Sequence, residues 1–453
     1  MSKFFLAIIG GGPAGYTAAE KASKAGKDVI LFEQNALGGT CLNVGCIPTK
    51  SLLYGAKQYY NATHAQKYGV TAENVAFDFA AMQKRKTIVV RKLVAGIKQR
   101  LNNEHCTLVS GFAQVAYRTD ELVTITCNGE TYEAENLMIC TGSTNFVPPI
   151  PGIKDNPAIW DSTDALVATE LPESIVIVGG GVIGMEFATL YYELGVEVTV
   201  IEAMPTILPN LDPDVVQILL DKYRKAGINI LTSTKVTKIE GNDVYVESSI
   251  KDAEKSRITS TKVLVSVGRR ANLSGLEALE GLETERGAIK IDDFCRTNLP
   301  NVYACGDVTG KIMLAHVASR QAEVAIGRML KQIPLQRIAY NAIPSVVYTN
   351  PEIASVGITE AQAAEMNIPV EVNKLPMTFS GRFMAENDGE TGLCKVITDA
   401  KNHSILGVHL IGNPCSEFIA AASFAVRMGY TTAEFQQVVF PHPTVSEVLH
   451  EAI

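Results

Sequence analysis

The sequence predicts an α/β protein with parallel sheets, and three observations support this fold class. The chain has 453 residues, a length that corresponds to about three domains. Hydrophobic residues make up 47% of it and charged residues 19%, an ordinary globular balance that provides a large core. The third observation is a repeat, in which an apolar strand, a glycine-rich turn, a helix and a second apolar strand occur twice.

Charge and apolar patterning argue against several other classes of protein. A formal net charge of −8 disfavours non-specific binding to nucleic acids or anionic membranes. No apolar segment of the sequence has the length that a membrane-spanning helix needs. The start, MSKFFLAIIGGG, is too short and wrongly flanked for a signal peptide, so we interpret it as the first strand and expect a cytoplasmic protein.

The two copies of the repeat keep their key residues in step. The first copy reads FFLAIIGGGPAGYTAAEKASKAGKDVILFEQ, and the second reads SIVIVGGGVIGMEFATLYYELGVEVTVIEA. Superimposing the copies aligns Gly10 with Gly179, Gly12 with Gly181, Gly15 with Gly184, Gly26 with Gly195, and Glu33 with Glu202.

Each copy contains the G-x-G-x-x-G pattern of a Rossmann-like dinucleotide-binding domain. The first glycine allows a tight turn, the second lets the backbone approach a pyrophosphate, and the third lets helix and strand pack closely. The helix N-terminus provides unpaired N–H groups for the phosphates, and the acid after the second strand accepts hydrogen bonds from a ribose. Both copies have this strand, helix and distant acid, so the chain is predicted to bind two dinucleotides.

The acidic residues also predict which nicotinamide cofactor the second unit prefers. Glu33 and Glu202 would each repel a 2′-phosphate. No lysine or arginine follows Glu202 through AMPTILPNLDPD, where an NADP site usually keeps its basic residues. The second unit is therefore predicted to bind NAD rather than NADP.

Cys41 and Cys46 form the only close cysteine pair of the sequence, within GGTCLNVGCIPTK. A zinc site would need a shorter spacing between the two cysteines and a second pair of ligands. Two unrelated buried thiols would not need the surrounding Gly and Pro residues. A disulfide requires a distorted helix start, because a regular helix rotates residues five apart by about 140°. An exposed disulfide in a reducing cell is most often catalytic. The remaining cysteines are interpreted as small buried hydrophobic residues, namely Cys106, Cys127, Cys140, Cys295, Cys305, Cys394 and Cys415.

Lys50 follows Cys46 after about one helical turn. A cation at this place would lower the pKa of a neighbouring thiol and stabilise the anionic reduced form of a flavin. Glu186, two residues after Gly184, is the candidate counter-ion for Lys50. The alternative for Glu186 is an ordinary surface position on its helix.

With these motifs the sequence resembles the flavin-dependent pyridine nucleotide–disulfide oxidoreductases over its whole length. The resemblance rests on GGTCLNVGCIPTK, both glycine units, LVSVGRRAN, VYACGDV, MLAHVAS and FPHPTVSEVLHEA. Within this family, the chain is similar to the members that oxidise dihydrolipoyl groups.

The resemblance implies FAD at the first glycine unit and NAD at the second. Asp307 is expected to hold the ribityl chain of FAD, the backbone of Ala315 to meet the flavin ring, and Ala113 to approach the adenine. The other residues implied around FAD are Gly10, Gly12, Gly15, Glu33, Thr40 and Lys50. Those implied around NAD are Gly179, Gly181, Gly184, Glu202, Val236 and Gly268.

The resemblance also implies an order of domains. An FAD-binding domain is expected over residues 1–145 and an NAD-binding domain over 146–267. A central region, 268–338, would complete the FAD domain. The last part, 339–453, would be an α+β dimerisation domain that forms a homodimer.

FPHPTVSE, near the C-terminal end, contains a candidate acid–base group. His442 taken by itself fits an ordinary surface or core histidine, but Glu447 follows at a spacing that lets its carboxylate orient the imidazole and raise its basicity. The resemblance implies that His442 is the acid–base residue, that its peptide bond to Pro443 is cis, and that it serves the cysteines of the other subunit.

The implied reaction is the oxidation of dihydrolipoyl groups through a redox-active disulfide and FAD, with NAD as the final acceptor and no metal. The lipoyl groups would belong to a partner protein of a 2-oxoacid dehydrogenase or glycine-cleavage complex.

Other functions fit the sequence less well. A glutathione-type reductase would show basic NADP-binding residues, and mercuric and thioredoxin reductases use extra C-terminal cysteines. A flavin-only transhydrogenase would not need the thiols. A non-catalytic nucleotide-binding subunit would not need the intact set Cys41, Cys46, Lys50, His442 and Glu447.

Overall fold

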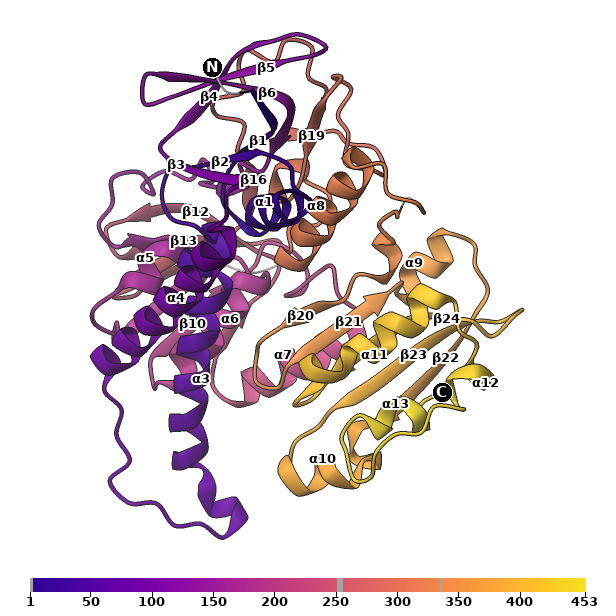
Figure 1. Ribbon diagram of the computed structural model, residues 1–453. Coiled ribbons are helices and arrows are strands. Elements are labelled where there is room, and N and C mark those ends of the chain that lie inside the picture. The colour runs from indigo at the N-terminus through magenta and orange to yellow at the C-terminus, as the bar shows by residue number, and fades with distance from the viewer. Residues whose placement is uncertain (1–2, 251–255, 335) are drawn as a thin grey trace. The chain divides into compact units, whose positions relative to one another are not determined.

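A computed structural model of the chain describes residues 3–250, 256–334 and 336–453 (Figure 1). The chain divides into two compact units, which are described separately. The first comprises residues 1–51, 80–146 and 268–338, and the second 52–79, 147–267 and 339–453. In the described residues, no helix combines the length and apolar character needed to cross a bilayer.

The first unit is built on one sheet with a parallel core. Its strand order is β3-β2-β1-β6-β5-β4, and β19 also pairs with β6. β1 pairs in parallel with β2 and β6, and its central residues are fully buried, as expected for a strand covered on both faces. Helices α1 (Pro13–Lys24) and α8 (Ala315–Met329) pack side by side (Figure 1). The strands are β1 (Lys3–Ile9), β2 (Val29–Glu33), β3 (Cys106–Ser110), β4 (Ala113–Arg118), β5 (Val123–Cys127), β6 (Glu130–Ile139) and β19 (Val302–Ala304).

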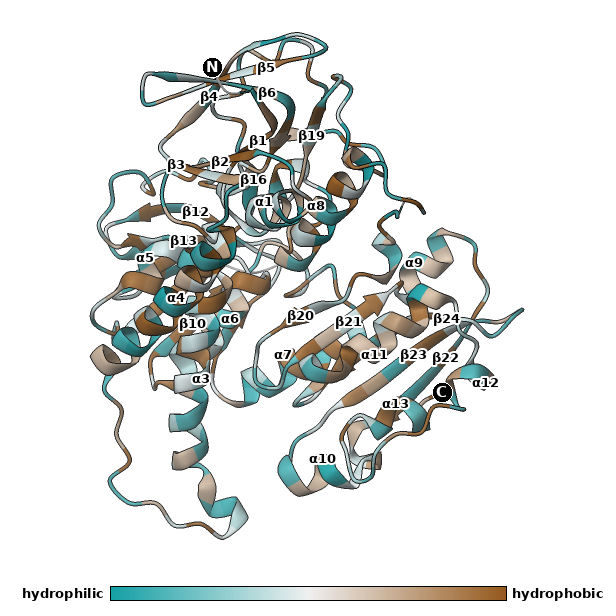
Figure 2. Ribbon diagram, in the orientation of Figure 1, coloured by the Kyte–Doolittle hydropathy of each residue, from teal (hydrophilic) through white to brown (hydrophobic). Residues whose placement is uncertain are grey.

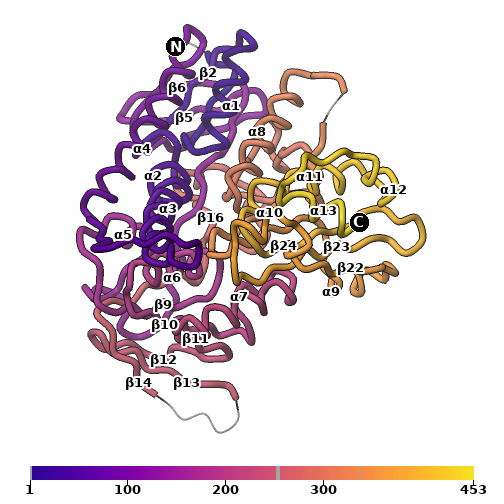
Figure 3. The backbone as a smooth tube through the Cα atoms, turned by 90° about the horizontal axis from the view of Figure 1, so that it is seen from below, coloured from indigo at the N-terminus to yellow at the C-terminus, as the bar shows by residue number. Residues whose placement is uncertain are grey.

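The second unit contains a parallel sheet, four strands of which are ordered as β3-β2-β1-β6 are in the first unit. Its strand order is β11-β10-β9-β15-β8, and helix α6 (Val182–Glu193) follows β9 as α1 follows β1. The strands are β8 (Ile159–Trp160), β9 (Ser174–Val178), β10 (Glu197–Ile201), β11 (Asn229–Leu231) and β15 (Lys262–Val265). A three-stranded antiparallel sheet accompanies it (Figure 3) and consists of β12 (Thr234–Glu240), β13 (Asp243–Ser248) and β14 (Ser256–Thr259).

The predicted repeat is present down to the pairing of individual residues. In the first copy Leu6 pairs with Val29, and in the second Ile175 pairs with Val198. These four residues superimpose when Gly10 is placed on Gly179. The two copies therefore fold with the same register, and the predicted α/β fold class is confirmed.

The last part of the second unit is an α+β arrangement, as predicted. Its antiparallel sheet has the order β20-β21-β24-β23-β22, and helix α11 (Cys415–Met428) packs on β21 and β24. Buried apolar residues of these elements form one core, and Figure 2 colours much of β21 and α11 as hydrophobic. The strands are β20 (Ser345–Val347), β21 (Ile353–Gly357), β22 (Val370–Pro376), β23 (Leu393–Asp399) and β24 (Ile405–Ile411).

Further helices and two pairs of short strands complete the two units. The remaining helices are α2 (Gly39–Val44), α3 (Cys46–Thr63), α4 (Phe79–Leu101), α5 (Ser162–Val167), α7 (Pro213–Lys225), α9 (Glu360–Glu365), α10 (Gly381–Glu386), α12 (Thr432–Phe435) and α13 (Glu447–Glu451). Two short antiparallel pairs are β7 (Ser143–Asn145) with β16 (Arg269–Ala271) and β17 (Thr284–Glu285) with β18 (Ala288–Ile289).

A buried carboxyl group joins α6 to the start of the C-terminal sheet. Glu193, at the end of α6, is only 4% exposed. Its Oε1 accepts a hydrogen bond of 2.7 Å from the side-chain amide of Asn350. Burial raises the pKa of Glu193 to about 7, against the effects of Asn350 and of the charges on Lys57 and Lys222. An uncharged donor thus faces a carboxyl group that is costly to ionise.

Replacing Glu193 with glutamine should stabilise the protein at pH 8. The pKa of Glu193 is about 7 in the folded protein, against an ordinary value of 4.5. Glu193 therefore contributes most to the free energy of unfolding below pH 4.5, and this contribution is lost as the pH rises through 7. The loss at pH 8 comes to about 3 kcal/mol. Glutamine keeps an oxygen for Asn350 without a charge. Its advantage over wild type in the free energy of unfolding should be about 2 kcal/mol larger at pH 8 than at pH 5.5.

Glu197→Gln, at an exposed position of β10, is the matched control and should show no such difference between the two pH values. Urea unfolding of both variants measures the effect. An equal advantage of Glu193→Gln at both pH values would contradict the raised pKa.

Candidate cofactor and thiol sites

The first glycine turn forms a cradle in which side chains would not fit. Gly10 has a φ of +105°, and a Cβ on it would lie 2.1 Å from the carbonyl oxygen of Cys140. A Cβ on Gly15 would lie 1.8 Å from the carbonyl oxygen of Gly10. The turn therefore needs glycine at both places. Gly12 caps α1 in an extended conformation, so the first N–H groups of this helix are available to a pyrophosphate.

Glu33 completes this cradle at the tip of β2. Its Oε2 accepts the N–H of Gly11 at 2.7 Å, and its Oε1 accepts the N–H of Asn35 at 2.8 Å. Two backbone donors thus fix the carboxylate. Because a carboxylate offers about four lone-pair directions, it retains capacity for ribose hydroxyl groups. The glycine cradle and this fixed acid fit the adenosine end of a dinucleotide.

The second glycine turn repeats these contacts in the second unit. Gly179 has a φ of +108°, and a Cβ on Gly184 would lie 2.0 Å from the Gly179 carbonyl oxygen. Glu202 accepts the N–H groups of Gly180 and Met204, each at 2.7 Å. Gly181 caps α6 in the same extended conformation as its counterpart in the first unit. The two turns therefore offer the same binding chemistry.

Two other residues predicted near NAD lie outside this turn. Val236 is half-buried on β12 in the second unit, whereas Gly268 belongs to the first unit and has a φ of +121°. Their proximity to the nicotinamide cofactor stays a prediction.

Changing Glu202 to glutamine should shift cofactor preference toward NADP. Glutamine keeps an oxygen acceptor for the turn but removes the charge that repels a 2′-phosphate. We expect the ratio of kcat/KM for NADP to that for NAD to rise about tenfold or more, which corresponds to about 1.4 kcal/mol. Steady-state kinetics with both cofactors measure this ratio. Equal use of NAD and NADP by the unaltered protein would show that Glu202 does not discriminate between them.

The thiol segment has the irregular backbone that the sequence predicts. Helix α2 ends at Val44, and α3 begins at Cys46, so that Gly45 separates the two helices. A Cβ on Gly45 would lie 2.9 Å from the Thr40 carbonyl oxygen, so this break also needs glycine. A Cβ on Gly39 would lie 2.7 Å from the Cα of Gly12, which shows that the segment packs directly against the first glycine turn.

The two thiols lie beside each other in a charged environment. Both are present as thiols, with Cys41 half-buried and Cys46 exposed. A hydrogen bond with Cys46 and burial raise the pKa of the Cys41 thiol, Lys50 acts in the opposite direction, and Asp307 adds to the rise. Cys46 is the first residue of α3, where the helix dipole favours a thiolate. The first unit thus brings together the predicted cysteines, Lys50 and Asp307.

The segment around Asp307 is held by contacts that the sequence does not predict. The hydroxyl of Ser143 donates to Asp307 Oδ2 at 2.6 Å, and Arg269 Nε donates to Ser143 Oγ at 2.7 Å. The N–H of Gly306 donates to the buried Gln321 at 2.6 Å. Residues 143 and 269 stand in short strands far from Asp307 in the sequence. Arg269 belongs to the motif LVSVGRRAN, but the motif does not indicate which side chains it contacts.

Two more residues predicted to contact FAD, Ala315 at the flavin ring and Ala113 at the adenine, also belong to the first unit. Ala315 is the first residue of α8, and Ala113 is buried at the start of β4. The N–H groups of the first turn of α8 have no acceptor within the helix. The contacts of both residues with FAD stay predictions.

Glu186 is buried rather than at the surface. It is 4% exposed on α6, and its Oε1 accepts the N–H of Tyr348 at 3.1 Å. The alternative of an ordinary surface position is therefore wrong. Lys50 belongs to the first unit and Glu186 to the second, and their pairing stays a prediction.

The candidate acid–base group has the expected local geometry. His442 Nδ1 lies 2.8 Å from Glu447 Oε1, and the N–H of Thr444 donates to Glu447 Oε2 at 2.7 Å. The Thr444 N–H and then His442 lower the pKa of Glu447, which keeps this carboxylate ionised. The His442–Pro443 peptide is cis, as predicted. The imidazole is 82% exposed, so its Nε2 edge is accessible from solution.

The remaining cysteines mostly follow their interpretation as hydrophobic residues. Cys127, Cys140, Cys295, Cys305, Cys394 and Cys415 are buried, and Cys106 is half-buried. Burial raises the pKa of the Cys106 thiol to about 11, so it is a weak nucleophile near neutral pH.

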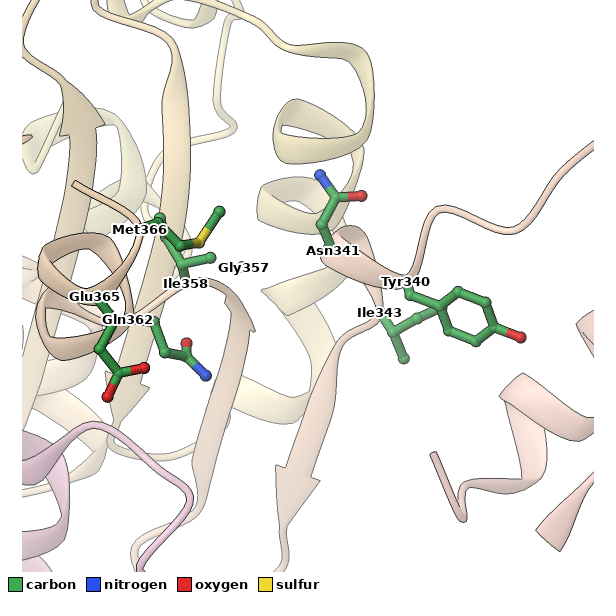
Figure 4. A pocket seen from close by; sticks show the side chains of 8 residues that line it. All are labelled: Tyr340, Asn341, Ile343, Gly357, Ile358, Gln362, Glu365 and Met366. Carbon is green, nitrogen blue, oxygen red and sulfur yellow. The ribbon is translucent and has the colours of Figure 1, made fainter. Parts of the chain in front are cut away.

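Two further features of the second unit contain none of the predicted site residues. A pocket is lined by Tyr340, Asn341, Ile343, Gly357, Ile358, Gln362, Glu365 and Met366 (Figure 4). A group of carboxylates encloses the buried ammonium of Lys395, which lies 2.8 Å from Asp212 and 2.6 Å from Asp214 and also pairs with Glu360. The ammonium of Lys395 therefore lies between these carboxylates and pairs with each of them.

Two sequence models of one protein family match most of this chain. The family model for pyridine nucleotide-disulphide oxidoreductases matches residues 4–322, and the model for the dimerisation domain of the same family matches residues 343–453. The chain belongs to this family, and the resemblance seen in the motifs is confirmed. Membership in the family implies FAD and NAD as cofactors.

Several individual members of this family are similar to the chain over nearly its whole length. Dihydrolipoyl dehydrogenase of Chlamydia pneumoniae is 36% identical, covering 99% of this chain and 96% of the relative. The protein of the same name from Thermus scotoductus is 37% identical, covering 100% and 97%. Among solved structures, the HOCl-induced flavoprotein disulfide reductase RclA of Escherichia coli superimposes with a TM-score of 0.85 at 30% identity, covering 99% of both chains.

Proposed function

We propose that this protein is a dihydrolipoyl dehydrogenase, which oxidises protein-bound dihydrolipoamide to lipoamide and reduces NAD to NADH. The observation that carries the proposal is the thiol pair at the broken helix start, packed against the first glycine turn. Full-length relatives of that name support it. The proposed setting is the cytoplasm, where thiols are kept reduced.

In the proposed reaction His442 is the base that activates the substrate. Glu447 accepts a hydrogen bond from the Nδ1–H of His442, which fixes the tautomer in which Nε2 has no proton and can accept one. That nitrogen would take a proton from one thiol of dihydrolipoamide. The ionised Glu447 then stabilises the imidazolium that results.

The substrate thiolate would attack Cys41 Sγ of the Cys41–Cys46 disulfide. A mixed disulfide forms, and the bond to Cys46 breaks and leaves a Cys46 thiolate. The second substrate thiol, after losing its proton, attacks the sulfur bound to Cys41, closes the lipoyl ring and frees Cys41. The substrate has then lost two electrons and two protons, and the cysteine pair has been reduced by two electrons.

The residues around the thiols favour this sequence of steps. Lys50 and the N-terminus of α3 would stabilise the Cys46 thiolate. FAD, when bound, supplies the two-electron relay between this dithiol and NAD. The first glycine turn, Glu33 and Asp307 would hold FAD, and the second turn and Glu202 would hold NAD.

The functional form is proposed to be a homodimer that acts on a lipoyl-bearing partner protein. The dimerisation domain of the family covers residues 343–453, and this segment contains His442. The cysteines belong to the first unit of the chain. We propose that each active site takes its cysteines from one subunit and its histidine from the other, as the family resemblance implies.

The direct test is NADH formation by the purified, FAD-loaded protein with dihydrolipoamide and NAD. We expect turnover with this pair and little with reduced glutathione and NADP. Turnover of glutathione disulfide with NADPH as the better activity would replace the proposal with a glutathione-type reductase. Tight binding of both cofactors without any disulfide chemistry would identify a non-catalytic member of the family.

A further inference from the structure

We propose that Ser143 and Arg269 are positioning residues that orient Asp307 for binding the ribityl chain of FAD. The inference rests on the proposed function in one respect, the assignment of Asp307 to FAD. Ser143 and Arg269 lie outside the glycine motifs and the thiol segment, and together they would hold the side chain of Asp307 in place.

The three side chains form a relay of hydrogen bonds within the first unit. Arg269 Nε donates to Ser143 Oγ at 2.7 Å, and Ser143 Oγ donates to Asp307 Oδ2 at 2.6 Å. A second guanidinium nitrogen of Arg269 donates to the Ser143 carbonyl oxygen at 2.8 Å. Strands β7 and β16 bring Ser143 and Arg269 together, because Asn145 pairs with Arg269 and Ser143 pairs with Ala271.

Chemistry fixes the direction of this relay. A guanidinium has only donors, so Ser143 Oγ must accept from Arg269. The single hydroxyl proton of Ser143 is then free to point at Asp307, which as a carboxylate can only accept. A hydroxyl that receives a bond from a cation is a stronger donor. The arrangement holds the Oδ2 oxygen of Asp307, and in the proposal Oδ1 accepts a hydrogen bond from a ligand hydroxyl group.

The backbone next to Asp307 has its own anchors. Gly306 donates its N–H to Gln321, which is fully buried, and its carbonyl oxygen accepts the Thr309 hydroxyl at 2.8 Å. These contacts do not involve Ser143. Removing the Ser143 hydroxyl should therefore release the side chain of Asp307 while the turn that carries it stays in place.

The test measures FAD affinity in a double-mutant cycle. Ser143→Ala, Asp307→Ala and the double variant are prepared as apoproteins, and FAD is titrated with its fluorescence as the signal. Ser143→Ala should weaken binding about tenfold to a hundredfold, as expected for a lost hydrogen bond to a charged group. Ser143→Thr, which keeps the hydroxyl, should bind FAD within about threefold of wild type.

The cycle separates positioning from a direct or a merely structural role. If Ser143 acts through Asp307, its substitution should cost nothing further in the Asp307→Ala background. Arg269→Lys keeps the charge but not the planar fork and should weaken FAD binding. Arg270→Ala is the matched control, because the Arg270 guanidinium lies over the ring of Phe146, 3.8 Å from its centroid, and it should leave affinity unchanged.

Two results would overturn the proposal. Additive losses in the double variant, or wild-type affinity in Ser143→Ala, would show that Ser143 does not work through Asp307. Wild-type affinity in Asp307→Ala would instead remove the assignment of Asp307 to FAD, and the proposal with it. Should an apoprotein fail to remain folded, release of FAD from the purified holoenzyme in increasing urea gives the same ranking of variants.

Discussion

Replacing either Cys41 or Cys46 with serine should lower NADH formation from dihydrolipoamide about a thousandfold or more, because neither variant can form the disulfide that accepts the substrate's electrons. The structure gives the two positions different environments. Cys46 begins α3, whereas the hydrogen bond with Cys46 and burial raise the pKa of Cys41. We therefore expect Cys46 to be the thiolate of the reduced pair.

Two further measurements on these variants test the separate roles. Electron transfer from NADH to a one-electron dye needs FAD but no thiol, and both variants should retain it, which shows that they are folded and loaded. Cys41→Ser should show the long-wavelength absorption of a thiolate beside a flavin without added reductant, and Cys46→Ser should lack it. The opposite pattern would exchange the roles of the two cysteines.

Mixing a Cys41→Ser protein with a His442→Gln protein should restore activity to about a quarter of wild type. Each variant by itself should be nearly inactive, since one lacks the attacked sulfur and the other the base, whose loss typically costs about 10²- to 10⁴-fold. In an isologous dimer with shared sites, a mixed dimer has one site with both defects and one with neither. Random exchange makes about half of the dimers mixed.

Subunit exchange is followed with two different affinity tags, so that mixed dimers can be isolated and assayed. If His442 served the cysteines of its own subunit, every site would keep one defect. Isolated mixed dimers without activity would therefore refute the shared site. Exchange between two differently tagged wild-type chains controls for inactivation by the exchange procedure.

The glycine turns could be predicted from the sequence because local sterics determine them. A Cβ at Gly10 or Gly15 would collide with backbone oxygen atoms, so the spacing of the glycines already contains the geometry of the turn. The same holds for Gly45, which breaks the helix between the two thiols. His442 and Glu447 are close in sequence, and their contact follows from a short, proline-restricted segment.

Contacts between distant segments could not be predicted in this way. Ser143 lies beside Arg269 because β7 pairs with β16, and it meets Asp307 because the segment that contains Asp307 packs against β16. Glu193 lies on an α6 whose sequence pattern does not distinguish a buried face from an exposed one, since most of this helix is buried. The surroundings of such residues depend on tertiary packing, and the side chains involved are common types without a distinctive spacing.

The equal register of the two repeats has a consequence for inhibition. FAD and NAD differ in their redox ends but share an adenosine diphosphate half, and the repeated turn with its fixed acid is suited to that shared half. ADP should therefore compete at both sites, more effectively at the one whose redox end contributes less to affinity. An inhibitor that is selective for one site should therefore gain its selectivity from atoms beyond the second phosphate, where FAD and NAD differ.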